Sequence, residues 1–158
     1  MVKVMELSKE AFEKYGTYTN MLSPAGCKIG NEPCEFYRDM IFLDQNTTST
    51  AFSVCRVLPR PLSVTELEYH NNTGEIMLPL DGDIYIPLAP ACGKDVPCAA
   101  EVEVFRVPSG TIVSIRKGVW HCGAYAAGSL ANVLIALPER TYFTDCYVRK
   151  MDGPAFEV

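Results

Sequence analysis

The chain has 158 residues, a usual length for one domain, and we expect a single domain spanning residues 1–158. Its residues are 48% hydrophobic and 21% charged, which excludes a mainly disordered chain, and its net charge of −5 provides no basic surface for nucleic acid or an anionic membrane. No apolar run approaches the roughly 20 residues of a membrane-spanning helix, and no signal-type segment opens the sequence. We therefore expect a cytoplasmic protein.

The first predicted element is a short helix at residues 7–16. Ser8 is a typical N-cap, Glu10 places an acid in the first turn, and Gly16 is a typical stop signal. Apolar residues recur at helical spacing between these limits. No later segment predicts a helix as clearly.

Beyond this helix the sequence is divided into short segments that predict strands. The 11 glycines and 11 prolines separate stretches rich in Val, Ile, Tyr and Phe that are too short for helices. This pattern is typical of a sandwich or barrel, so we predict an all-β fold. The predicted strands lie at residues 35–43, 49–58, 66–70, 75–80, 84–89, 102–106, 111–115, 133–137 and 145–148.

Two of the connections between these strands can be predicted from their residues, one as a tight turn and one as a long loop. Asp81, Gly82 and Asp83 separate two apolar segments and predict a tight β-hairpin, because glycine accepts the positive φ of such turns. Residues 90–98 predict a long loop.

The seven cysteines contain no Cys-x2-Cys pair and are odd in number. They therefore predict neither a zinc ribbon nor a full disulfide framework. In a reducing compartment we expect most of them to be small buried apolar residues.

The histidines His70 and His121 are the residues around which a site is predicted. The sequence around the first is Glu68-x-His70-x4-Glu75-x6-Gly82. A spacing of two on a strand directs Glu68 and His70 to the same face. Glu75 can return beside them on the next strand, after a turn at residues 71–74.

The sequence around the second histidine is Gly110-x5-Arg116-x-Gly118-x2-His121. Together the two segments resemble the paired signature of the cupin superfamily, His-x-His-x3–4-Glu-x6-Gly followed by Gly-x5-Pro-x-Gly-x2-His. Glu68 stands where a histidine is usual, and Arg116 replaces the proline. The resemblance implies a cupin-type double-stranded β-helix, a jelly-roll barrel, which the short amino-terminal helix predicted above accompanies.

The cupin resemblance also implies a metal site. In typical cupins the matching positions hold one divalent metal inside the barrel, and imidazole with carboxylate suits Mn, Ni, Zn or Fe. The implied ligands are Glu68, His70, Glu75 and His121. The alternative is a hydrogen-bonded acid and imidazole cluster in a wet pocket, since a related branch of the superfamily uses this cavity without metal.

A closer resemblance covers nearly the whole chain, which is similar to the ureidoglycolate lyase family. The matching segments occur in a common order, at residues 7–16, 55–59, 66–70, 118–121 and 145–146. Glu75 stands where the lyase branch has glutamine, and a carboxylate at this position favours a metal-binding cupin.

This family implies an enzyme that cleaves ureidoglycolate, an intermediate of purine degradation, into glyoxylate and urea. The chemistry requires a cation for the substrate carboxylate, a base for the hydroxyl proton and an acid for the departing nitrogen. Arg56 and Arg116 offer planar guanidinium groups for the carboxylate. Trp120 is a barrel-wall aromatic whose indole N–H can meet a ligand. The proton-transfer candidates are Glu68, His70 and His121.

Two other functions fit the same residues, because a fold does not determine a function. One is a metal-dependent cupin isomerase or epimerase acting on a sugar or keto acid, and the other is a non-catalytic cupin that binds a small ligand. The exposed edges of an all-β barrel also predict a homodimer.

Overall fold

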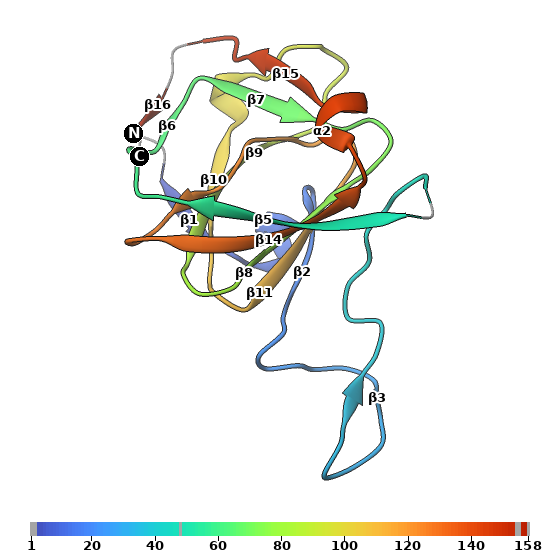
Figure 1. The fold of residues 1–158 in the computed structure, drawn as a ribbon. Helices are drawn as coiled ribbons and strands as arrows, with labels where there is room; N and C mark the ends of the chain where they lie inside the picture. Colours follow the sequence, from blue (N-terminus) through green and yellow to red (C-terminus); the bar gives the residue numbers. More distant parts are fainter. Residues whose placement is uncertain (1–2, 48, 154–155, 158) are drawn as a thin grey trace.

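The computed structural model describes residues 3–47, 49–153 and 156–157, and its elements are mainly strands (Figure 1). Two β-sheets face each other, and the largest hydrophobic core contains side chains from both, with Met77 and Val113 from one sheet and Ile86 and Phe105 from the other. The chain passes repeatedly between the sheets. The structure therefore confirms the predicted all-β, cupin-type double-stranded β-helix.

The larger sheet has seven strands and is antiparallel except for its first pair. Its strands, in spatial order, are β1 (Val4–Glu6), β10 (Glu103–Val107), β9 (Ile84–Ala89), β12 (Trp120–His121), β7 (Glu66–Tyr69) and β15 (Tyr147–Lys150), with β13 (Tyr125–Ala126) also paired to β9.

The smaller sheet has five antiparallel strands. In spatial order they are β2 (Gly16–Asn20), β11 (Thr111–Ile115), β8 (Glu75–Pro79), β14 (Ala131–Pro138) and β5 (Thr50–Val57). Two further pairs lie outside these sheets, β3 (Lys28–Ile29) with β4 (Phe36–Tyr37), and β6 (Ser63–Val64) with β16 (Phe156–Glu157).

The predicted amino-terminal helix exists but is shorter than expected. Ser8 caps it as predicted, since its Oγ accepts a hydrogen bond from the Ala11 N–H at 3.2 Å, and α1 covers only Lys9–Phe12. Gly16 does not follow a helix end but begins β2, opposite Ile115. A Cβ at this glycine would lie 1.8 Å from the backbone oxygen of Ser114, so the close approach of two strands requires glycine here.

The structure contains short helical segments that the sequence pattern did not predict. These are the 3-10 turn η1 (Ala99–Glu101) and the helix α2 (Thr141–Thr144). Within the described part of the chain, no helix has the length and apolar character needed to cross a membrane.

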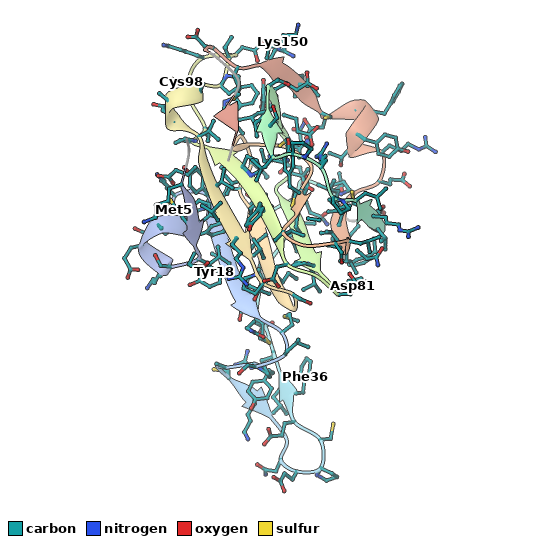
Figure 2. All side chains as sticks on the ribbon, turned by 90° about the vertical axis from the view of Figure 1, so that its left-hand side faces the viewer. Met5, Tyr18, Phe36, Asp81, Cys98 and Lys150 are labelled. Atoms are coloured by element: carbon teal, nitrogen blue, oxygen red, sulfur yellow. The ribbon has the colours of Figure 1, made fainter. Side chains whose placement is uncertain are left out.

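The strand predicted at residues 35–43 is wrong beyond β4. Asp39 has a φ of 56°, in the left-handed region, which interrupts extended backbone. β3 and β4 form a small hairpin that projects away from the barrel, and Phe36 lies on this projection (Figure 2).

Residues 81–83 do not form the predicted β-hairpin. They join β8 in one sheet to β9 in the other, so the two flanking strands do not pair. Gly82 has no positive φ. A Cβ there would lie 2.6 Å from the backbone oxygen of Leu130, so this glycine permits close packing rather than a left-handed turn.

The prediction that most cysteines are buried is also wrong. All seven are free, and none is fully buried; Cys98, Cys122 and Cys146 are half-buried, and Cys27, Cys34, Cys55 and Cys92 are exposed. The exposed ones lie in the projecting segment, on the edge strand β5 and in the loop at residues 90–98, which the core does not reach.

Candidate functional site

Four side chains that the sequence motifs single out converge between the two sheets: Glu68, His70, Glu75 and His121. Each offers a ligand atom, and these atoms all lie within 4.8 Å of one another. Glu68 of β7 lies directly opposite His121 of β12, and His70 follows β7. Glu75 begins β8 in the facing sheet. The cluster is thus assembled from neighbouring strands of one sheet and one strand of the other.

Glu75 is the centre of this cluster. Its Oε2 lies 3.1 Å from Nε2 of His70 and 3.1 Å from Nε2 of His121. The three residues are only 6%, 3% and 1% exposed, respectively. Burial of ionisable groups is costly unless they neutralise one another or bind an ion.

The other nitrogen of each ring determines where the imidazole hydrogens lie. Nδ1 of His70 is 2.7 Å from the carbonyl oxygen of Asp145, and Nδ1 of His121 is 2.8 Å from that of Val119. A carbonyl oxygen only accepts, so both Nδ1 atoms carry hydrogen and donate. In a neutral ring the Nε2 lone pair then faces Glu75, and such lone pairs repel a carboxylate unless protons or a cation lie between them.

Burial alone would raise the pKa of Glu75, but hydrogen bonds from His121 and His70, and the positive charge of both rings, outweigh this and hold the pKa at about 2. Burial alone would lower the pKa of His121, but the hydrogen bond and charge of Glu75, and the charge of Glu68, raise it. A divalent cation between the imidazole nitrogens and Glu75 would offset the negative charge of that carboxylate, as protons on the imidazoles do.

The donor set therefore fits a divalent metal. Two imidazole nitrogens with carboxylate oxygens suit Mn, Fe, Ni or Zn. Hydrogen bonds from Nδ1 to backbone carbonyls are also the usual support of metal-binding histidines, because they set the tautomer and the ring orientation. The four residues that can hold a metal are Glu68, His70, Glu75 and His121.

Glu68 is the member of the cluster that reaches a cavity. The residues that line a cavity of about 390 Å³ include Glu68, Glu66, Val148, Arg60 and Tyr125. The guanidinium of Arg60 lies 4.1 Å from the centre of the Tyr125 ring, which orients it by a cation–π contact. The cavity thus combines an acid from the cluster with the guanidinium of Arg60.

The structure does not bring the two predicted arginines to this cavity. Arg56 is exposed on β5, and because its neighbour Val57 packs into the core between the sheets, the alternation of the strand directs Arg56 outward. Arg116 is exposed beyond β11 and donates to the backbone carbonyl of Glu13. Trp120 is buried against Tyr69, with ring centres 4.5 Å apart, in the packing of the barrel wall.

Sequence reasoning missed three residues near the cluster. Arg60 lies on the connection that follows β5 and has no motif of its own. Asp145 and Cys146 lie within the segments that resemble the lyase family, but their contacts were not foreseen. Cys146 Sγ lies 2.9 Å from Glu68 Oε2, and the Asp145 carbonyl accepts from His70. Burial, followed by the hydrogen bond to Glu68, raises the pKa of the Cys146 thiol to about 12.

The sequence of this chain is similar to those of known proteins. The profile of a family described as Ureidoglycolate lyase matches residues 1–155. Ureidoglycolate lyase from Escherichia coli and its counterpart from Shigella boydii are each 27% identical to this chain over 128 residues, 79% of either protein. Among solved structures, a dTDP sugar isomerase from Desulfovibrio desulfuricans is 16% identical, with a TM-score of 0.47 over 88% of this chain and 86% of that chain.

Proposed function

Because the chain belongs to the ureidoglycolate lyase family, we propose that it is a lyase that cleaves the carbon–nitrogen bond of ureidoglycolate, giving glyoxylate and urea. The observation that carries this proposal is the cluster of buried His70, Glu75 and His121 with half-buried Glu68, beside a cavity that Arg60 also lines. The reaction belongs to the amidine-lyase type.

Arg60 is the residue that we expect to bind the substrate carboxylate. Its guanidinium can donate two parallel hydrogen bonds to a carboxylate, and the ring of Tyr125 already limits its orientations. With the carboxylate at Arg60, the rest of a small substrate lies in the direction of Glu68, since both residues line the same cavity.

Glu68 is the residue that we expect to transfer the proton. It accepts the hydrogen of the substrate hydroxyl as the carbonyl group of glyoxylate forms, and the carbon–nitrogen bond breaks with its electron pair going to nitrogen. The proton then passes to that nitrogen, so urea leaves neutral and Glu68 returns to its starting state. His70 and His121 keep their Nε2 atoms toward Glu75 throughout, because both Nδ1 atoms are held by carbonyls.

The same residues supply the proposed metal site. Glu68, His70, Glu75 and His121 would hold one divalent ion, and such an ion, when bound, polarises a substrate oxygen as a Lewis acid.

The direct test is release of urea and glyoxylate from ureidoglycolate, measured with Mn, Ni, Zn or Fe added between about pH 6 and pH 9. We expect turnover by the unmodified protein and a loss of kcat/KM of about 100-fold or more in His121→Ala. Arg60→Ala should raise KM about tenfold or more, because it removes charge-assisted hydrogen bonds to the carboxylate. Arg56→Ala, which removes an outward-facing guanidinium, is the matched comparison and should change KM by no more than about twofold.

Absence of urea release under all of these conditions contradicts the proposed function. Turnover that depends on Arg56 and not on Arg60 contradicts the proposed position of the substrate, but not the reaction itself.

A further inference from the structure

Asp145 and Cys146 are adjacent residues between α2 and β15, and both contact the cluster from a distant part of the sequence. The Asp145 carbonyl accepts the hydrogen bond from Nδ1 of His70 at 2.7 Å, and Cys146 Sγ lies 2.9 Å from Oε2 of Glu68. One dipeptide therefore touches two of the four candidate ligands.

The position of this dipeptide is itself fixed on both sides. The Asp145 N–H donates to the Thr141 carbonyl at 2.9 Å, at the end of α2. Its buried carboxylate accepts from the backbone N–H of Asn71 at 3.0 Å, and from the backbone N–H and side-chain amide of Asn72 at 2.8 and 3.1 Å. These hydrogen bonds tie Asp145 to the turn that connects His70 with Glu75.

After Asp145, the chain enters β15, which pairs with β7 so that Val148 lies opposite Glu68. Cys146 precedes this pairing and its thiol faces the Glu68 carboxylate, which can only accept. The thiol thus donates, and since a carboxylate has about four acceptor positions, the hydrogen bond leaves Glu68 free to bind a cation as well.

We propose that Cys146 is a positioning residue for the metal centre, which holds the Glu68 carboxylate toward His70, Glu75 and His121 and is itself held in place by Asp145. This inference rests on the metal centre of the proposed function. Cys146 acts through Glu68 and does not bind the metal: the sulfur does not belong to the group of four ligand atoms that lie within 4.8 Å of one another.

The test is cobalt binding to the full chain after dialysis against EDTA, followed by calorimetry and by visible and near-ultraviolet absorption. Cys146→Ala removes the donor, Cys146→Ser restores one, and Cys98→Ala is the matched control, because Cys98 is a half-buried cysteine that contacts none of the four ligands. Thermal unfolding of the cobalt-free proteins shows whether each variant is folded.

We expect Cys146→Ala to weaken cobalt binding about 10- to 100-fold, the usual effect of removing a hydrogen-bonding partner of a ligand. Cys146→Ser should bind within about threefold of the unmodified protein, and Cys98→Ala should be unchanged. The cobalt spectrum should have ligand-field bands without a sulfur-to-cobalt charge-transfer band.

Unchanged affinity in Cys146→Ala overturns the inference, and so does a serine variant as weak as the alanine variant. A sulfur-to-cobalt band that disappears in Cys146→Ser would identify Cys146 as a ligand and equally overturn the positioning role. If the unmodified protein binds no cobalt, both the metal centre and this inference fail. Normal cobalt binding without any release of urea refutes only the proposed reaction.

Discussion

Replacement of Glu75 by glutamine should destabilise the metal-free protein in acid far more than in alkali. Glu75 is buried and lies 3.1 Å from Nε2 of both His70 and His121. In the folded protein the pKa of His121 is raised, so its charged form stabilises the fold below about pH 6.5 and this contribution is lost as the pH rises through the folded-state pKa. The pKa of Glu75 is lowered from 4.5 to about 2, so its contribution is present above pH 4.5 and is lost as the pH falls toward 2.

Near pH 5.5, His121 and Glu75 therefore both make their full contribution to the free energy of unfolding. Removing one partner of a buried ion pair leaves the other charge unpaired and costs about 3–5 kcal/mol, so we expect a loss of this size in the free energy of unfolding. As the pH rises through the raised pKa of His121, that ring loses its positive charge, and the glutamine amide can donate to its Nε2 lone pair. The loss should then fall to about 1 kcal/mol or less.

The assay is urea unfolding in EDTA at about pH 5.5 and about pH 9, followed by the fluorescence of Trp120, the single tryptophan, which is 2% exposed. Glu139→Gln, at an exposed position, is the matched control and should change stability by no more than about 0.5 kcal/mol at either pH. A loss in Glu75→Gln that is equal at both pH values, or larger in alkali, would refute the ionic account of the cluster.

Two further predictions address the metal and the sheet. Manganese affinity should increase as the pH rises through the range in which imidazoles lose their protons, because each Nε2 must be deprotonated to coordinate the metal. Calorimetry in buffers of different ionisation enthalpy should detect the protons released on binding. Manganese binding that does not change with pH would argue against histidine ligands. Gly16→Ala should reduce the free energy of unfolding by about 1–3 kcal/mol or more, because its Cβ would meet the Ser114 backbone, whereas Gly93→Ala, with open space around it, should be neutral. A urea midpoint of Gly16→Ala equal to that of the unmodified protein would contradict the close approach of β2 to β11.

The core of the site was predictable because its signals are local. Glu68, His70 and Glu75 lie within eight residues of each other, and the period of a strand with one turn is enough to place them together. His121 required the second motif, since its register opposite Glu68 is a long-range pairing.

The residues around the cluster were not predictable in this way. Cys146 contacts Glu68 and Asp145 contacts His70 only because β15 pairs with β7, which no local pattern indicates. Arg60 reaches the cavity through an irregular connection, whereas Arg56, on a regular strand, is directed outward by its alternation with Val57.

The fold was predicted in its class but not in its connections. The pair Asp81 and Asp83 around a glycine has the composition of a hairpin, yet the turn joins two different sheets. Composition indicates that a turn occurs, and tertiary packing determines which strands it brings together.

The central claim is that Glu68, His70, Glu75 and His121 form one divalent metal site. The most direct measurement is a manganese titration of the EDTA-treated protein followed by electron paramagnetic resonance. We predict one saturable site per chain in the unmodified protein, and binding weaker by at least about 100-fold in Glu75→Gln, which replaces a negatively charged ligand by a neutral amide. Absence of saturable binding in the unmodified protein, or equal binding by the two proteins, would contradict the claim.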